Sequence, residues 1–174
     1  MREPRVQPTG RERTWREDDV IVSKTDLKGI ITYANLTFQE ISGYSEEELL
    51  GQPHSIVRHP DMPRCVFKLL WDTIESGREI FAYVKNMAKT GDHYWVFAHV
   101  TPTFDSYGNI IGYHSNRRCP DRHQVRTFAE LYAQLLAEEN RHPDWRKGMA
   151  AATGILQNAL AAKSMSYDEF IFSI

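Results

Sequence analysis

The residues best suited to bind a charged group lie in one stretch, residues 51–63, which reads Gly-Gln-Pro-His-Ser-Ile-Val-Arg-His-Pro-Asp-Met-Pro. Its prolines fix φ and remove backbone donors, so the stretch can hold only one or two short helical turns. It carries His54, Arg58, His59 and Asp61. Rigid loops that present such groups often bind a ligand. The alternative is a connection between helices with a local Arg58–Asp61 pair.

Composition limits the class of protein. A chain of 174 residues, 41% of them hydrophobic, can form one domain with a smaller appendage. The net charge of −2 gives no reason to expect nucleic-acid binding. Residues 1–19 lack the apolar stretch of a signal peptide, and no run approaches the ~18 apolar residues of a membrane span. We therefore expect a soluble, cytoplasmic protein without a membrane span.

The sequence contains no recognisable catalytic or metal-binding set. Cys65 and Cys119 lack the spacing of a metal or redox motif, and we expect two unpaired thiols in a reducing cytosol. No nucleophile–base set, phosphate loop or catalytically spaced carboxylate pair is present. We therefore predict a binding protein, not an enzyme, with no metal site.

Alternating apolar and polar residues, or β-branched residues, predict five strands: residues 20–25, 30–34, 79–88, 93–104 and 110–119. Helical spacing and capping residues predict the helices: residues 36–42, one turn after Ser45, 64–76, a helix started by Pro120-Asp121 that runs to about 140, about 145–165, and a short apolar end after a capping box at Ser166. Tight turns join the last three strands, which makes the sheet antiparallel. The predicted fold class is α+β: a five-stranded antiparallel sheet with helices on one face, plus a C-terminal helical extension.

The space between the helix at residues 64–76 and the sheet is the natural place for a cavity. The helices of the C-terminal extension have apolar faces that need a surface to cover them. Two arrangements remain open: these helices pack on the outer face of the sheet, or they pair with a second copy of the chain.

The ordered set of motifs resembles a PAS domain, in particular the sensor domain of bacterial aerotaxis receptors. The segments that carry the resemblance are Thr25–Leu27, Ala34–Phe38, Ile41–Tyr44, Glu48–His54, Val57–Pro63, Trp71, Val84–Asn86 and Gly91–Val96. The resemblance implies a PAS fold. Aerotaxis-type PAS domains hold FAD non-covalently and report its redox state, so it also implies a flavin-binding redox or oxygen sensor.

The resemblance implies a set of cofactor-binding residues: His54, Arg58, His59, Asp61, Trp71, Asn86 and Tyr94. Arg58 could neutralise a pyrophosphate, and Trp71 offers an aromatic surface to a flavin or adenine ring. Asn86 offers both a donor and an acceptor to the polar edge of a flavin. Simpler roles remain open: Trp71 and Tyr94 could only pack in the core, and His59 could brace its loop.

Two other functions are compatible with the same fold. One is a PAS module without cofactor, which serves protein–protein interaction or dimerisation. The other is haem binding, for which His54, His59, His93 and His99 are available. Because the predicted helix at residues 64–76 contains no histidine to face the cavity, the sequence favours FAD over haem.

The resemblance covers a domain at residues 20–120, which leaves a flexible N-terminal arm or cap at 1–19 and a helical extension at 121–174. Trp15 could dock the arm on the domain. Receptors of the family continue into membrane, linker and methyl-accepting segments, which these residues do not contain. We therefore expect output through contacts of the sheet face and C-terminal helices with a chemoreceptor-like or kinase-like signalling protein, or with a second copy.

Overall fold

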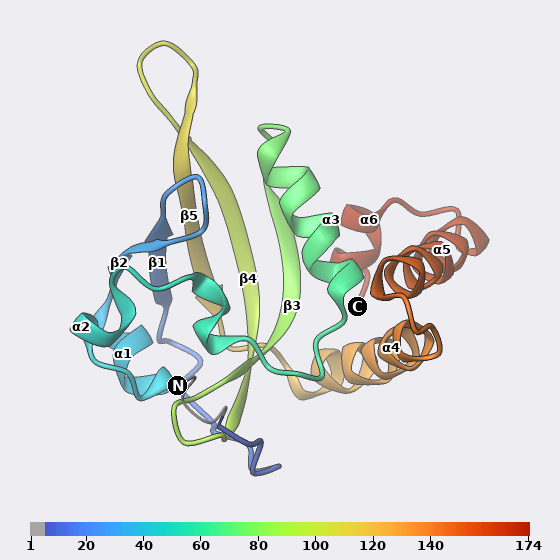
Figure 1. Ribbon diagram of the computed structural model, residues 1–174, viewed down its shortest axis with the longest axis horizontal. Helices are drawn as coiled ribbons and strands as arrows, with labels where there is room; N and C mark the ends of the chain where they lie inside the picture. The colour runs from blue at the N-terminus through green and yellow to red at the C-terminus, as the bar shows by residue number, and fades with distance from the viewer. Residues whose placement is uncertain (1–5) are drawn as a thin grey trace.

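The computed structural model describes residues 6–174, so the first five residues of the predicted N-terminal arm lie outside the described residues. Its centre is a five-stranded sheet with strand order β2-β1-β5-β4-β3, in which every neighbouring pair runs antiparallel (Figure 1). The strands are β1 (Ile21–Thr25), β2 (Ile31–Ala34), β3 (Ile80–Met87), β4 (His93–Phe104) and β5 (Ile110–Arg118). The predicted antiparallel sheet is confirmed.

Four helices lie between β2 and β3, and the first two begin where the sequence places capping residues. They are α1 (Leu36–Ser42), α2 (Glu46–Leu49), the 3₁₀ helix η1 (His54–Val57) and α3 (Arg64–Glu75). The Asn35 side chain accepts the amide of Phe38 at the start of α1, and Gly43 ends this helix with a φ of 75°. Ser45 and Glu48 form the predicted capping box of α2. Local caps therefore direct the chain from β2 toward α3.

The two faces of β3 and β4 are covered differently, because side chains alternate along a strand. One face carries Val84, Val96 and Ala98, which are buried on the side of α3. The other face carries the aromatic rings of Tyr83 and Trp95. The inner face therefore forms the core with α3, and the outer face is free to receive the C-terminal extension.

The C-terminal extension consists of α4 (Arg122–Asn140), α5 (Trp145–Ala162) and α6 (Tyr167–Phe172). Helices α4 and α6 pack on the outer face of the sheet. Tyr83 stacks on Phe128 with ring centroids 4.2 Å apart, and Phe81 meets Phe172 at 4.8 Å. The Tyr132 hydroxyl donates to the carbonyl oxygen of Tyr83 at 2.7 Å. Of the two arrangements that the sequence left open, the structure shows packing of the extension on the outer face of the sheet.

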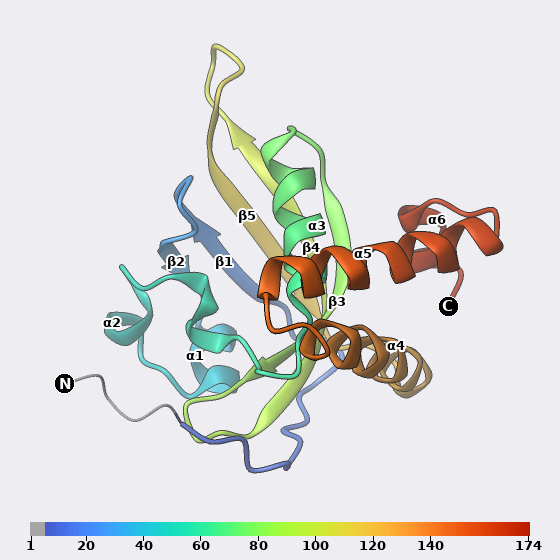
Figure 2. The same cartoon turned by 45° about the vertical axis from the view of Figure 1, so that its right-hand side comes forward.

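Helix α5 returns along α4 and lies across α3 (Figure 2). Gly148 permits the close approach of α5 to α4, because a Cβ there would lie 2.3 Å from the carbonyl oxygen of Glu139. The pair of helices lies to the side of β3, the edge strand of the sheet (Figure 1). The sequence predicted α5 to continue to about residue 165. It ends at Ala162, since Ser164 has a left-handed φ of 53°.

A buried carboxylate connects α4 to α3. Glu139 is only 3% exposed and accepts the backbone amides of Arg64 at 2.9 Å and of Cys65 at 2.8 Å. The N-cap residue of α3, Pro63, makes no side-chain cap of its own. Glu139 therefore satisfies amides that the first turn leaves open and places negative charge at the positive end of the helix. This contact joins the N-terminus of α3 to α4.

The described part of the N-terminal segment lies against the turn between β3 and β4. The amide of Thr9 donates to the carbonyl oxygen of Gly91 at 3.0 Å, and that of Arg13 donates to His93 at 2.7 Å. The indole of Trp15 donates to the carbonyl oxygen of Trp95 at 3.2 Å. Among residues 6–174, no helix has the length and apolar character needed to cross a lipid bilayer.

Candidate functional site

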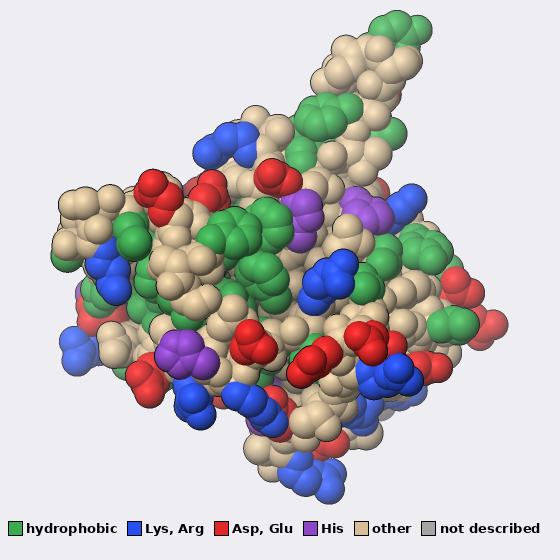
Figure 3. Space-filling model, turned by 180° about the vertical axis from the view of Figure 1, so that it is seen from behind, with side chains coloured by type: hydrophobic (Ala, Val, Ile, Leu, Met, Phe, Trp, Pro, Cys, Tyr) green, Lys and Arg blue, Asp and Glu red, His purple; other side chains and the backbone are tan. Residues whose placement is uncertain are grey.

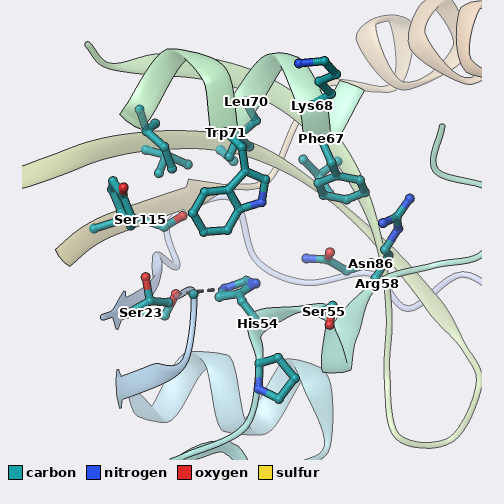
Figure 4. A pocket seen from close by; sticks show the side chains of 18 of the residues that line it. Ser23, His54, Ser55, Arg58, Phe67, Lys68, Leu70, Trp71, Asn86 and Ser115 are labelled. Atoms are coloured by element: carbon teal, nitrogen blue, oxygen red, sulfur yellow. Dashed lines mark hydrogen bonds between the residues drawn. The ribbon is translucent and has the colours of Figure 1, made fainter. Parts of the chain in front are cut away.

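A cavity of about 510 Å³ lies between α3, the inner face of the sheet and η1 (Figure 4). This volume is within the ~300–1,000 Å³ that is usual for small-molecule sites. Helix α3 contributes Phe67, Leu70 and Trp71, and the sheet contributes Val84 and Val96. These side chains make the middle of the cavity apolar, and the rings of Phe67 and Trp71 both lie beside it (Figure 4).

Four of the residues predicted for cofactor binding line this cavity: His54, Arg58, Trp71 and Asn86. Figure 4 shows them arranged around one space. The backbone of Arg58 pairs with that of Asn86 in an isolated antiparallel bridge. Because paired residues direct their side chains to the same face, Arg58 and Asn86 both reach the cavity. Trp71 is placed close to the β1–β2 turn by Gly29, where a Cβ would lie 3.0 Å from the indole. The structure therefore brings together residues from η1, α3 and β3.

The other three predicted residues, His59, Asp61 and Tyr94, are not among those that line the cavity. The buried His59 accepts the amide of Asp61 at its Nδ1 atom, 3.1 Å away, which braces the loop. The Asp61 carboxylate instead pairs with Lys85 Nζ at 2.7 Å. Tyr94 is fully buried in the core, and burial raises the pKa of its hydroxyl. Direct contact of these three residues with a cofactor stays a prediction.

The sequence did not identify Arg117, a buried cation at the inner end of the cavity. Arg117 is 2% exposed, donates to Ser23 Oγ and places Nη1 3.3 Å from His54 Nε2. Its guanidinium lies 4.5 Å from the ring centroid of Phe38. Burial lowers the pKa of Arg117 to about 10, so the group stays charged at neutral pH. The alternation of side chains along a strand could have revealed it, because Arg117 lies on the same face of β5 as Ser115, which also lines the cavity.

Positive charge dominates the cavity. Five cationic residues of the described chain line it and no Asp or Glu does: Lys28, Arg58, Arg64, Lys68 and Arg117. The Nε atom of Arg117 is buried without a hydrogen-bond partner in the described part of the chain. Lys68 and Arg64 are half exposed and have the carboxylates of Asp72 and Glu139 nearby, whereas Arg117 is buried without an ion pair among the described residues. Because an uncompensated buried charge is costly, Arg117 favours a ligand that carries negative charge.

Acid is expected to destabilise the ligand-free protein through His54. Its ring stacks on Phe38 with centroids 5.8 Å apart, and burial, followed by the charge of Arg117, lowers the pKa of His54 to about 3. The unfolded chain, with a pKa of ~6.5, binds more protons between these values, so stability is lost as pH falls through this window. Between about pH 7 and about pH 5, the loss from this residue is about 2 kcal/mol.

Urea unfolding at the two pH values measures this effect. The variant His54→Gln should lose about 2 kcal/mol less than the wild type between them, because it cannot bind the extra proton. His123→Gln, at an exposed position of α4, serves as the control and should follow the wild type. A wild-type slope in His54→Gln would mean that His54 does not carry the effect.

The sequence is similar to known PAS proteins. The family described as PAS fold matches residues 31–117. The aerotaxis receptor of Escherichia coli (strain K12) is 44% identical over 121 residues, which are 70% of this chain and 24% of the receptor. The nitrogen fixation regulatory protein of Klebsiella pneumoniae is 30% identical over 99 residues, 57% of this chain and 20% of that protein. The chain thus spans about a quarter of the receptor's length.

Solved structures show the same fold. The light state of the blue-light photoreceptor Aureochrome1 LOV has a TM-score of 0.55 and 25% identity, and the match covers 66% of this chain and 88% of that one. A light-oxygen-voltage domain studied with a flavin analogue has a TM-score of 0.56 at 21% identity, over 71% of this chain and 87% of that one.

Proposed function

The chain belongs to the PAS family, and from this premise we propose that it is a sensor module that holds FAD in the cavity and reports redox or oxygen status to a signalling partner. The observation that carries the proposal is the lining of the cavity. An apolar middle beside Trp71 suits a flat aromatic ring, and the cationic side chains of the lining suit a pyrophosphate. FAD has both an aromatic ring system and a pyrophosphate, and it is the ligand that the resemblance to aerotaxis sensors implies.

Four side chains would hold the flavin. Arg58 would pair with phosphate, Trp71 would contact an aromatic ring, and Asn86 would exchange hydrogen bonds with the polar edge of the flavin. Arg117, whose Nε has no partner in the described chain, would face an acceptor of the ligand. The bound flavin would supply reversible electron transfer, and the protein would supply its environment.

Strand β3 offers a path from the cavity to the C-terminal helices. Asn86 faces the cavity, and the carbonyl oxygen of Tyr83, in the same strand, accepts the hydroxyl of Tyr132 on α4. A change in the hydrogen bonds that a ligand makes with Asn86 would therefore shift β3, the strand on which α4 packs. The resulting shift in the docking of α4 and α6 would be the output to a partner.

The absorption spectrum of freshly purified protein, before and after dithionite, tests the cofactor. We expect flavin bands that bleach on reduction, or their appearance after incubation with FAD and removal of the excess. Asn86→Ala should change the position of the bands or weaken the binding of FAD, whereas Tyr107→Ala, at an exposed position of the β4–β5 turn, should do neither. A colourless wild-type protein that takes up no FAD would refute the proposal.

A module without cofactor is the second candidate function. Phe81, Phe97 and Phe172 form an aromatic cluster on the outer face, and Phe172 is 61% exposed. Figure 3, which shows the back of the molecule, has hydrophobic side chains gathered beneath the projecting hairpin. Such a surface could receive a signalling protein or a second copy. In this case Trp71→Ala and Asn86→Ala would change stability alone, and Phe172→Asp would reduce self-association measured by sedimentation.

A further inference from the structure

Helix α5 lies outside the residues matched by the PAS family, yet it lines the cavity with Trp145 and Met149. Trp145 is the first residue of α5, where Asp144 caps the helix by accepting the amide of Arg146. The tryptophan is 49% exposed, although it faces a cavity. Large aromatic side chains in this position are available to cover a ligand.

Cations surround the same part of the cavity. Arg64 and Lys68 lie one turn apart on α3, the helix that α5 crosses, and their side chains are 50% and 49% exposed. Lys68 Nζ pairs with the exposed Asp72 at 2.6 Å, and Arg64 Nη1 lies 4.0 Å from Glu139, so a phosphate would compete with the first pair and add to the second. The Arg58 guanidinium lies 4.3 Å from the ring centroid of Phe67, also on α3. Burial, followed by repulsion from the charge of Arg64, lowers the pKa of Arg58, and the charge of Glu139 offsets part of this effect. A polyphosphate between the two guanidinium groups would relieve this repulsion.

We infer that the C-terminal extension completes the ligand site: Trp145 and Met149 form a platform for a nucleobase, beside a phosphate-binding group made of Arg58, Arg64 and Lys68. The inference rests on the proposed flavin binding and specifies how a dinucleotide flavin is preferred to a mononucleotide. The ring system would occupy the cavity near Trp71, and the adenosine would lie against α5. The Arg146 guanidinium lies 4.9 Å from the centroid of the Trp145 ring, so adenosine would take the face of the ring that Arg146 leaves open. A flavin without adenosine would make no contact with Trp145.

Coupling between ligand and extension follows from this arrangement. If adenosine contacts α5, its binding stabilises the docked position of the α4–α5 pair, and the docked pair strengthens binding by the same factor. Glu139 adds to the coupling, because it joins α4 to the first turn of α3, where Arg64 lies. The extension would thus sense occupancy of the cavity directly, in addition to any change carried by β3.

Titrations with riboflavin, FMN and FAD, followed by quenching of flavin fluorescence, test the inference on the full chain. In Trp145→Ala we expect the affinity for FAD to fall roughly 10-fold, the usual size of one base–aromatic contact, and the affinities for riboflavin and FMN to stay the same. Trp145→Phe should retain most of the affinity for FAD. Ile155→Ala, on the same helix at a residue that does not line the cavity, should resemble the wild type.

Two results would overturn the inference while leaving the proposed function intact. The first is an unchanged affinity for FAD in Trp145→Ala. The second is an equal loss for all three flavins, which would mean that Trp145 only supports the fold. Far-ultraviolet circular dichroism confirms that each variant is folded, and Trp145→Phe provides the comparison if the alanine variant is not. Failure of the wild type to bind any flavin would instead refute flavin binding itself, and the inference with it.

Discussion

Replacement of Arg117 by methionine is expected to raise the free energy of unfolding of the ligand-free protein by roughly 1–3 kcal/mol, and to weaken flavin binding on the order of tenfold or more. The two effects have opposite signs because the same charge acts in two states. In the ligand-free protein the guanidinium is 2% exposed, and it has no carboxylate among the described residues that line the cavity with it. Methionine fills a similar volume without a charge to desolvate.

In the loaded protein the balance changes, because a ligand acceptor would satisfy the Nε atom that is buried without a partner. Charge-assisted hydrogen bonds of this kind contribute about 1.5–3 kcal/mol each. Urea unfolding of the ligand-free protein and titration with FAD measure the two quantities. Arg118→Met, at the exposed neighbouring residue of β5, is the matched control and should leave both within error of the wild type. A variant that loses stability without ligand would show that Arg117 is a structural residue.

The sequence predicts elements well where the signal is local. Asn35, Ser45 and Asp121 mark helix starts through their own side chains, and the structure has α1 and α4 within the predicted bounds. Strand β4 also has its predicted bounds, because turn residues flank an alternating stretch on both sides. The end of α5 was missed, since nothing in the residue type of Ser164 indicates its left-handed conformation.

The lining of the cavity was predicted only in part, for reasons of geometry. Arg58, His59 and Asp61 are neighbours in sequence, but successive residues of a non-helical segment point in different directions. Only Arg58 therefore lines the cavity. Arg117 and Trp145 come from elements distant in sequence, and their approach depends on how β5 and α5 pack. Sequence spacing alone does not predict contacts between distant elements, and the PAS match ends at residue 117, before α5.

Glu139→Ala is expected to cost about 3 kcal/mol of folding stability, although α4 lies outside the PAS match. The carboxylate is buried and accepts two amides of the first turn of α3, at 2.9 and 2.8 Å, so its removal leaves both donors without a partner. Glu139→Gln keeps one acceptor oxygen and should lose about half as much. Glu138→Ala, at the neighbouring residue that pairs with Arg141 and His142, should lose less than ~1 kcal/mol.

Urea unfolding of the three variants gives these differences, and titration with FAD adds a second measurement. Because α3 carries Arg64, Phe67 and Trp71 into the cavity, loss of its cap should also weaken the binding of flavin. Equal stability of Glu139→Ala and Glu138→Ala would mean that α3 is held by its packing on the sheet alone. A loss confined to Glu139→Ala would instead make α4 part of the support of the site, and would explain how a ligand under α3 can reach a helix on the opposite face of the sheet.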